Sequence, residues 1–222
     1  MGGSLRNAGS PETDMDVHLI AIVGGSGSGK SWLADRLAEQ FGANAGRIAL
    51  DDFYRCRAHL PPADRSRVNF DDPAAMDWTL FGRTLARLRA GEPVELPEYD
   101  FVAHVRRPVT RPWHPRRLVL VEGLWLLHEA RLRPLYSLSV FIDCTEALRL
   151  ARRQERDQRE RGRSAEEVHA QFLRDVAPMH RRYVEPQRQH ADLVVSLDSG
   201  SAAMAEVGAV VGRLVERGGA VR

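Results

Sequence analysis

Short apolar runs alternate along the chain with longer stretches in which apolar residues recur every three or four positions. The runs have the length and composition of buried strands, and we expect strands at residues 17–23, 47–50, 118–121, 138–142 and 193–195. The amphipathic stretches predict helices at about residues 31–41, 76–90, 146–160, 165–190 and 202–216, with a bend of the fourth near Pro178 and Pro186. This alternation predicts an α/β domain with a doubly wound parallel sheet and helices on both faces.

Residues 92–115 differ in character from the rest of the chain. They alternate apolar and polar positions and contain several prolines, which favours an extended or hairpin excursion that forms a small lobe over the site. With 222 residues, we expect a single domain of about residues 17–218. Residues 1–16 are polar and rich in Gly, Ser, Asn and Pro, which predicts a disordered, mobile tail.

A glycine-rich loop follows the first predicted strand and contains the only lysine among 32 Lys and Arg residues. It consists of Gly24, Gly25, Ser26, Gly27, Ser28, Gly29, Lys30 and Ser31. This spacing between a strand and a helix is that of phosphate-binding loops, whose N–H groups face a nucleoside triphosphate. Lys30 then reaches the β- and γ-phosphates, and Ser31 ligates Mg²⁺. A Gly/Ser-rich turn with a chance Lys-Ser pair is the alternative, but the flanking strand and helix favour triphosphate binding.

Acidic residues follow several of the predicted strands. Ligands of a parallel sheet bind beyond the carboxyl ends of its strands, so we expect one rim to collect Lys30, Ser31, Asp51, Asp52, Glu122 and Asp143. A charged residue directly after a buried strand needs a partner, which favours functional roles for Asp51 and Glu122. A carboxylate at this rim can accept a proton from an acceptor hydroxyl or hold Mg²⁺. For Asp143, a helix cap or loop hydrogen bond is the preferred interpretation.

Seven arginines lie at residues 149, 152, 153, 156, 159, 161 and 163. Several share a helix face and Gly162 allows a hinge, so we interpret residues 149–170 as an arginine-rich helical lid that neutralises phosphate charge. The alternative is a solvated helix with surface pairs Glu155–Arg159 and Asp157–Arg161, which is favoured for Arg159 and Arg161. A nucleic-acid patch is a third interpretation, which the interleaved acids weaken.

The bulk composition narrows the class of partner. The formal net charge of +2 gives no global attraction to nucleic acid or to a membrane, and no run of 18 apolar residues occurs. Cys56 and Cys144 lack metal-like spacing, so we interpret them as reduced structural thiols of a cytoplasmic protein. We expect small-molecule partners and neither a nucleic-acid nor a membrane partner, while association into a homo-oligomer stays open.

With these residues identified, the chain resembles the uridine kinase (uridine–cytidine kinase) family, within the group of P-loop kinases that includes phosphoribulokinase. The resemblance covers about residues 17–196, and the joint order and spacing of its motifs are specific. The matching stretches are residues 24–31, Asp51-Asp52-Phe53-Tyr54, Asn69-Phe70-Asp71-Asp72-Pro73, Tyr99-Asp100-Phe101-Val102-Ala103-His104, Glu122-Gly123, Arg153-x-x-Arg156-Asp157, Glu160-Arg161-Gly162-Arg163 and Ala191-Asp192.

The resemblance implies transfer of the γ-phosphoryl group of ATP or GTP to the 5′-hydroxyl of uridine or cytidine, giving UMP or CMP in pyrimidine salvage. It implies that Asp51 is the general base and that Lys30, Arg156 and Arg161 stabilise phosphate charge. Ser31, Glu122 and Asp51 then belong to the Mg²⁺ site. On the acceptor side the implied residues are Asp71 at the ribose hydroxyls, Arg153 beside the ribose, Phe70 and Phe101 as apolar walls, and Tyr99, His104, Arg163 and Gln171 around the base.

Two departures from the family pattern leave choices open. Residues 196–200 replace a Pro-Arg-Gly-Gly-like turn near the donor, so ATP and GTP both stay open as donors. The loop at residues 55–67 carries Arg55, Arg57, Arg65 and Arg67, which is more basic than a neutral nucleoside needs. A kinase of another small alcohol, such as a sugar phosphate or pantothenate, is therefore the alternative. A nucleotide-dependent switch module is less favoured, because it needs no acceptor pocket.

Overall fold

The computed structural model describes residues 16–65, 67–197 and 201–219, without the side chains of Arg161, Ser201 and residues 217–219. Its central sheet contains β1 (His18–Gly24), β2 (Ala45–Ala49), β5 (Leu118–Gly123), β6 (Leu138–Asp143) and β7 (Leu193–Ser196). All five strands are parallel, in the order β2-β5-β1-β6-β7. The predicted α/β fold with a parallel sheet is confirmed. The tail predicted at residues 1–16 lies almost wholly outside the described residues.

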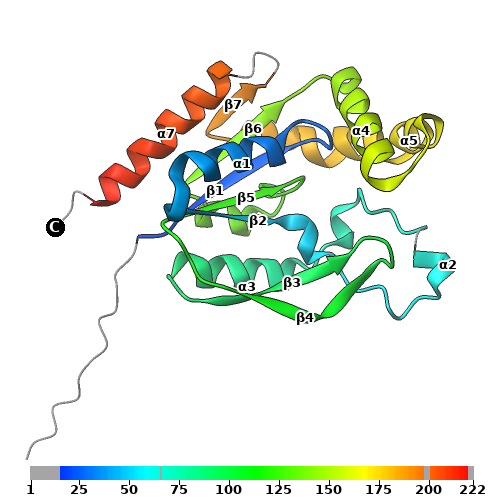
Figure 1. Ribbon diagram of the computed structural model, residues 1–222, viewed down its shortest axis with the longest axis horizontal. Helices are drawn as coiled ribbons and strands as arrows, with labels where there is room; N and C mark the ends of the chain where they lie inside the picture. Colours follow the sequence, from blue (N-terminus) through cyan, green and yellow to red (C-terminus); the bar gives the residue numbers. More distant parts are fainter. Residues whose placement is uncertain (1–15, 66, 198–200, 220–222) are drawn as a thin grey trace, which may run out of the picture.

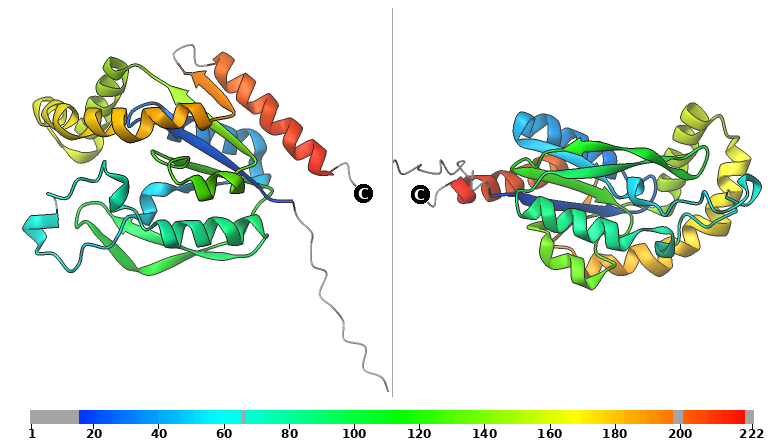
Figure 2. Two further views of the ribbon diagram at one scale, coloured as in Figure 1. Left: turned by 180° about the vertical axis from the view of Figure 1, so that it is seen from behind. Right: turned by 90° about the horizontal axis from the view of Figure 1, so that it is seen from below.

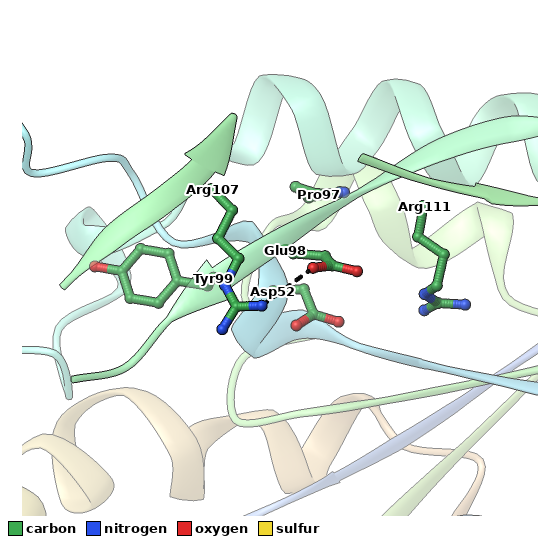
Figure 3. Close-up of a pocket in the computed structure, with 6 residues that line it drawn as sticks. All are labelled: Asp52, Pro97, Glu98, Tyr99, Arg107 and Arg111. Atoms are coloured by element: carbon green, nitrogen blue, oxygen red, sulfur yellow. Dashed lines mark ion pairs between the residues drawn. The ribbon is translucent and has the colours of Figure 1, made fainter. Parts of the chain in front are cut away.

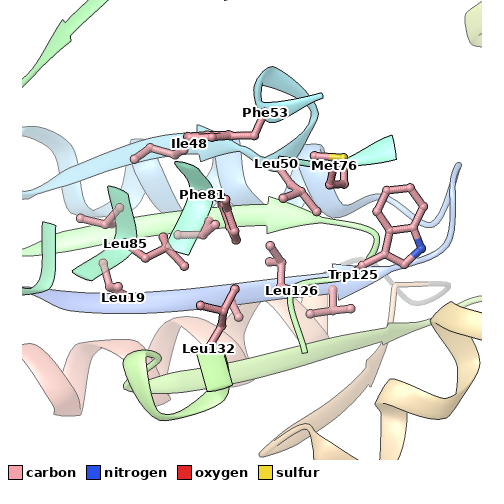
Figure 4. Close-up of a cluster of buried hydrophobic side chains, with 14 of the residues drawn as sticks. Leu19, Ile48, Leu50, Phe53, Met76, Phe81, Leu85, Trp125, Leu126 and Leu132 are labelled. Carbon is pink, nitrogen blue, oxygen red and sulfur yellow. The ribbon is translucent and has the colours of Figure 1, made fainter. Parts of the chain in front are cut away.

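Helices cover both faces of the sheet (Figure 1). On one face, α1 (Lys30–Phe41) and α7 (Ser201–Gly219) bury Leu33, Leu37 and Val207 against alternate residues of the strands. On the other face, α3 (Trp78–Arg89) buries Phe81 and Leu85 (Figure 4). The strands are apolar on both faces because both faces are covered, which is why they form continuous apolar runs in the sequence.

An antiparallel hairpin lies beside α3, formed by β3 (Val94–Asp100) and β4 (Val105–Trp113). Val94, Leu96 and Trp113 are buried in the same hydrophobic cluster as α3, while most of β4 is exposed. The register shifts between Pro97 and Tyr99, as expected where a proline interrupts a ladder. The segment predicted to be extended or hairpin is therefore a hairpin, whose tip reaches the carboxyl edge of the sheet.

The arginine-rich segment forms α4 (Glu146–Arg161), which begins at Thr145, whose side chain accepts the Leu148 N–H. It ends at Gly162, which has a left-handed φ of 62°. A second helical stretch begins with α5 (Ala165–Gln171) and runs back along the sheet (Figure 2, left). Its successive turns are η5 (Phe172–Val176), α6 (Ala177–Met179), η6 (His180–Val184) and η7 (Glu185–His190). The helix predicted at residues 165–190 is thus continuous but contains two π-helical segments, at η5 and η6.

Shorter helical elements that the periodicity does not predict complete the chain. They are η1 (Gly42–Asn44), η2 (Leu50–Phe53), α2 (Pro62–Arg65), η3 (Pro73–Ala75) and η4 (Ala130–Leu135). Of these, η2 matters for the site, because it follows β2 at the carboxyl edge of the sheet and carries Asp51. Within the described residues, no helix has both the length and the apolar character needed to cross a membrane.

Candidate active site

The predicted phosphate-binding loop connects β1 to α1 and packs tightly against α4. Gly27 and Gly29 have left-handed φ values of 80° and 99°, which non-glycine residues rarely adopt. A Cβ atom on Gly27 would overlap the carbonyl oxygen of Arg149, and one on Gly25 would lie 2.8 Å from both the Arg149 Cδ and the His180 Nδ1. The glycines are therefore required by close contact with α4 and η6 as well as by backbone angle.

Lys30 occupies the first turn of α1, where only 9% of its surface is exposed. Its Nζ donates a hydrogen bond to the carbonyl oxygen of Gly25 over 2.9 Å. Burial lowers the pKa of the Lys30 ammonium, and the carboxylates of Glu122 and Asp51 act in the opposite direction. Lys30 is thus a buried cation that is hydrogen-bonded to the phosphate-binding loop. The nearby carboxylates of Glu122 and Asp51 favour its charged form.

Ser31 and Glu122 join the phosphate-binding loop to the end of β5. The Ser31 Oγ donates to the Glu122 Oε1 over 3.0 Å, and the Arg47 Nη2 contacts the same oxygen over 2.8 Å. Arg47 also pairs with Asp35 of α1 over 2.7 Å. Hydroxyl and carboxylate oxygens are the ligands that Mg²⁺ prefers, so Ser31 and Glu122 fit that ion. The described residues contain no group of three or more His, Cys, Asp or Glu side chains that could hold a metal.

Asp51 lies at the start of η2 and lines the same cleft as Lys30 and Ser31. Asp51 keeps an exposed surface toward the cleft, but desolvation by the surrounding protein atoms and the neighbouring charge of Glu122 raise the pKa of its carboxyl to about 6, against the opposing effect of Lys30. An aspartate with this pKa is ionised at neutral pH yet more basic than usual. This is the property that a general base requires.

A cleft of about 1130 Å³ brings the two ends of the predicted site together. Its lining includes Ser26, Gly27, Gly29, Lys30, Ser31, Asp51 and Glu122 from the edge of the sheet. It also includes Phe70, Asp71, Tyr99, Phe101, His104, Arg153, Arg156, Arg163 and Gln171. Every predicted catalytic, metal or acceptor-side residue with a described side chain therefore borders one cavity. Arg161 is the exception, because its side chain is outside the described residues.

Aromatic rings form one wall of the cleft. The rings of Phe70 and His104 stack, with centroids 4.7 Å apart and planes inclined by 19°. Tyr54 packs edge-on against Phe70 and donates from its hydroxyl to the Phe70 carbonyl oxygen over 2.9 Å. Burial raises the pKa of Tyr99 to about 12, and its phenol oxygen has no hydrogen-bond partner among the described residues. This wall therefore offers an apolar ring surface, with the Tyr99 hydroxyl as a polar group that has no hydrogen-bond partner among the described residues.

Arginines of α4 and the following turn form the opposite wall. The Arg153 Nη1 donates to the Ser26 Oγ of the phosphate-binding loop over 2.8 Å. The Oε1 of Gln171 accepts from the Arg153 Nη2 over 3.2 Å and from the Arg163 Nη1 over 2.7 Å. Arg149, the first of the seven arginines, is 2% exposed, packs under the phosphate-binding loop and does not line the cleft. The wall formed by the predicted lid therefore begins after Arg149.

Two of the six residues expected on one rim do not line this cleft. Asp52 faces a second, smaller pocket beside the hairpin, together with Glu98, Arg107 and Arg111 (Figure 3). Asp143 forms an ion pair with Arg188 over 3.1 Å instead of the helix cap or loop hydrogen bond preferred for it, and Thr145 caps α4. The strand-end rule gives the edge at which a residue lies, but not the direction in which its side chain points.

The predicted surface position of Asp157 is wrong, whereas its predicted pairing with Arg161 stays untested because the Arg161 side chain is outside the described residues. The Asp157 side chain is fully buried, and it contacts Arg153, Arg156 and Arg163. Arg159, by contrast, is exposed as expected, and pairs with the adjacent Glu160 over 2.6 Å. Alternating charges along a helix predict a solvent-exposed helix. Local periodicity does not reveal that a second helix, here α5, packs against one face of α4.

Sequence reasoning assigned no role to several residues that line the cleft, namely Trp32, Tyr54, Val68, Asn69, Val102, Leu124, Glu160, Arg174 and Asp175. Tyr54 supports the ring of Phe70 and could have been suspected from its position three residues after Asp51. Arg174 and Asp175 lie in the π-helical turn η5, which the sequence does not reveal.

A sequence model of the Phosphoribulokinase / Uridine kinase family matches residues 19–201, which include the loop, the cleft and all of the sheet strands except the first residue of β1. The chain belongs to this family. It is 40% identical over 182 residues to the uridine kinase of Klebsiella pneumoniae subsp. pneumoniae, covering 80% of this chain and 85% of that relative. It is 41% identical over 177 residues to the uridine kinase of Chloroflexus aggregans, covering 79% and 85%.

Solved structures place this member of the family among P-loop kinases. A Silicibacter kinase provisionally assigned to a fructose transport system covers 84% of this chain and 92% of its own, with a TM-score of 0.68 and 26% identity. The phosphoribulokinase of Rhodobacter spheroides covers 82% of this chain and 71% of its own, with a TM-score of 0.62 and 18% identity, which shows the shared fold.

Proposed function

We propose that the protein is a uridine kinase that transfers the γ-phosphoryl group of ATP or GTP to the 5′-hydroxyl of uridine or cytidine, giving UMP or CMP. The relatives at about 40% identity that are named uridine kinase support this choice within the family. The observation that carries it is a single cleft whose lining includes Asp51, residues of the phosphate-binding loop and the stacked rings of Phe70 and His104.

On the donor side, residues Gly24 to Ser31 cradle the triphosphate. The N–H groups of the loop and the N-terminus of α1 attract its oxygens, and Lys30 exchanges the Gly25 carbonyl for a phosphate. Arg156, which lines the cleft, offsets the charge of the transferred phosphoryl group, and the same role is implied for Arg161 by the resemblance to the family. Ser31 and Glu122, with Asp51, would hold Mg²⁺, which would neutralise the charge of the phosphates.

On the acceptor side, the ring pair of Phe70 and His104 faces the nucleoside, with Phe101 as a further wall. Asp71 accepts hydrogen bonds from the vicinal ribose hydroxyls, and Arg153 lies beside the ribose. The base is recognised by Tyr99, His104, Arg163 and Gln171. Burial lowers the pKa of His104, so its neutral ring supplies one donor and one acceptor nitrogen, which suits the edge of a pyrimidine.

Asp51 connects the two ends by accepting the proton of the 5′-hydroxyl. Ionised at neutral pH, it orients the hydroxyl oxygen toward the phosphorus and takes the proton as the new P–O bond forms. Closure of the arginine wall then excludes water, which would otherwise compete as acceptor. This series of reaction steps requires no covalent intermediate on the protein.

The four arginines of the 55–67 loop give little support for a phosphorylated acceptor. The Arg55 Nε donates to the Met76 carbonyl oxygen and the Arg65 Nε to that of Leu60, each over 2.9 Å, so both side chains stabilise the loop itself. Of the four arginines only Arg67 lines the cleft, and it is mostly exposed and pairs with Asp64. A nucleotide-dependent switch module is less favoured, because it needs no acceptor pocket and therefore does not account for the aromatic wall of the cleft.

The test is phosphoryl transfer from ATP and from GTP with Mg²⁺ across uridine, cytidine, adenosine, ribulose 5-phosphate and pantothenate. We expect selective turnover of uridine and cytidine. Turnover of pantothenate or of the sugar phosphate would keep the donor site and Asp51 but would reject the roles given to Tyr99, His104 and Gln171. Comparing ATP with GTP decides the donor.

A further inference from the structure

A single carboxylate gathers three arginines of the cleft wall. The Asp157 Oδ1 accepts from the Nε and the Nη2 of Arg156 over 2.9 and 2.8 Å. Its Oδ2 lies 3.4 Å from the Arg163 Nη1 and 3.8 Å from the Arg153 Nε. The Asp157 side chain has no exposed surface, and Arg153 is only 6% exposed. A charge buried this completely is retained only with partners that hold it, so the geometry of the cluster is tightly fixed.

The backbone of Asp157 strengthens the same connection. Its carbonyl oxygen accepts the N–H of Gly162 at the end of α4 and the N–H of Arg163 over 3.3 Å. Main chain and side chain of Asp157 therefore both hold Arg163, on the far side of the left-handed turn at Gly162. Because this turn joins α4 to α5, Asp157 fixes the angle at which the two helices of the predicted lid meet.

The cluster extends to both ends of the cleft. Arg153 reaches the Ser26 Oγ of the phosphate-binding loop, and Arg153 and Arg163 share the Oε1 of Gln171 on α5. Arg156 remains partly exposed and lines the cleft. A continuous chain of hydrogen bonds and ion pairs thus runs from the donor loop, through Arg153, to Gln171 at the acceptor end, with Asp157 behind it.

We propose that Asp157 is a positioning residue that couples acceptor binding to triphosphate binding, by holding Arg153, Arg156 and Arg163 on one buried carboxylate. This inference rests on the proposed function. A ligand that draws one of these arginines toward itself changes how tightly Asp157 holds the other two. Asp157 also offsets the mutual repulsion of three guanidinium groups, so they can face a single cleft before any phosphate is bound.

The test compares Asp157→Asn with Glu155→Gln, the same kind of change on an exposed position of α4. Calorimetry measures uridine affinity with and without a non-hydrolysable ATP analogue, and steady-state kinetics give kcat and KM. In the wild type we expect the analogue to change uridine affinity at least about fivefold. In Asp157→Asn that ratio should fall below about twofold and kcat should drop about 10- to 100-fold, while affinity for the analogue alone changes little. Glu155→Gln should behave as the wild type.

Two results would overturn the inference. One is a wild type whose uridine affinity ignores the analogue, and the other is an Asp157→Asn variant with wild-type coupling and kcat. A merely structural role would lower thermal stability and the amount of active enzyme but would leave the affinity ratio of the folded fraction unchanged. Circular dichroism melting curves of both variants separate these cases.

A second pair of variants decides the matter if Asp157→Asn does not fold. Arg156→Gln and Arg163→Gln are made singly and together, and kcat/KM for uridine is measured. If both act through Asp157, the combined loss should be smaller than the product of the two single losses. Losses that multiply would refute the inference. If the wild type phosphorylates a different acceptor, the proposed function fails, and the same cycle is measured with that acceptor.

Discussion

The ring of His104 stacks on the ring of Phe70, with centroids 4.7 Å apart and planes inclined by 19°. The two residues come from separate parts of the fold, since Phe70 precedes η3 and His104 lies in the turn between β3 and β4. His104 has a left-handed φ of 54°, which is uncommon for a residue other than glycine and places its ring over Phe70. The hairpin therefore contributes a stacking surface to the cleft, at the cost of a strained backbone.

Replacing His104 by Asn tests this surface without adding backbone strain, because Asn tolerates the left-handed region. We expect KM for uridine to rise about tenfold, since a ring contact and a base-facing group are both lost. KM for ATP should stay within a factor of about two, because the donor loop is untouched. His114→Asn is the matched control on exposed chain after β4, and it should leave both constants unchanged. An equal rise in both KM values would instead indicate general loosening of the cleft.

Tyr99→Phe removes a hydroxyl that is buried without a hydrogen-bond partner in the described part of the chain. Because an unsatisfied buried group costs free energy, the variant should be as stable to heat as the wild type or slightly more so. If the nucleoside satisfies this hydroxyl, KM for uridine should rise about five- to tenfold. Tyr136→Phe is the control, since the Tyr136 hydroxyl is also buried and has no hydrogen-bond partner among the described residues, but does not line the cleft. It should reproduce the change in stability without the change in KM.

How much of this site the sequence predicts depends on the range of the interactions involved. The central strands β1, β5 and β6 are predicted well because both of their faces are buried, and Thr145 is predicted as a cap because capping is local. The π-helical turns of η5 are not predicted, because they depend on packing rather than on local periodicity. The burial of Asp157 is missed for the same reason, since one of its arginine partners, Arg163, lies beyond the turn at Gly162.

The chemistry is predicted better than the direction of individual side chains. A lone lysine in a glycine-rich loop indicates phosphate binding whatever the tertiary structure, because the spacing itself builds the anion site. Asp51 and Asp52 are adjacent, and the strand-end rule does not separate them. In the structure Asp51 faces the cleft and Asp52 faces the hairpin, because the 3₁₀ turn η2 rotates successive side chains apart.

The raised pKa of Asp51 predicts the pH dependence of the reaction. With a pKa of about 6, Asp51 is protonated below that value and cannot accept the hydroxyl proton. We therefore expect kcat/KM to rise with pH up to about 6 and then level off. Asp51→Asn should lower kcat by about 10²- to 10⁴-fold and abolish this acid limb, with nearly unchanged affinity for ATP. Asp52→Asn is the control and should keep the limb.

The same pKa fixes the sign of a contribution to stability. The folded protein binds the Asp51 proton more tightly than the unfolded chain, whose carboxyl titrates near 3.8. Between these two values the folded state holds more protons, so this group makes the free energy of unfolding decrease as pH rises. Urea unfolding at pH 4, 5, 6 and 7 should show a smaller decrease for Asp51→Asn than for the wild type. An identical pH dependence would mean that the Asp51 pKa is not raised.

Gly27 and Gly91 give a matched pair of tests for the contact between the phosphate-binding loop and α4. Their φ values are 80° and 77°, so an Ala at either position is strained, by about 1–2 kcal/mol. A Cβ on Gly91 meets nothing within 4 Å, whereas one on Gly27 overlaps the backbone carbonyl of Arg149, which cannot rotate away.

We expect Gly91→Ala to lose only stability. Gly27→Ala should lose more stability and also bind ATP at least about tenfold more weakly, because the loop and α4 must separate. Calorimetric titration with ATP and urea unfolding measure both effects. Wild-type ATP affinity in Gly27→Ala would show that the loop can move away from α4 and still bind phosphate. The packing of the loop against α4 would then not set the geometry of the donor site.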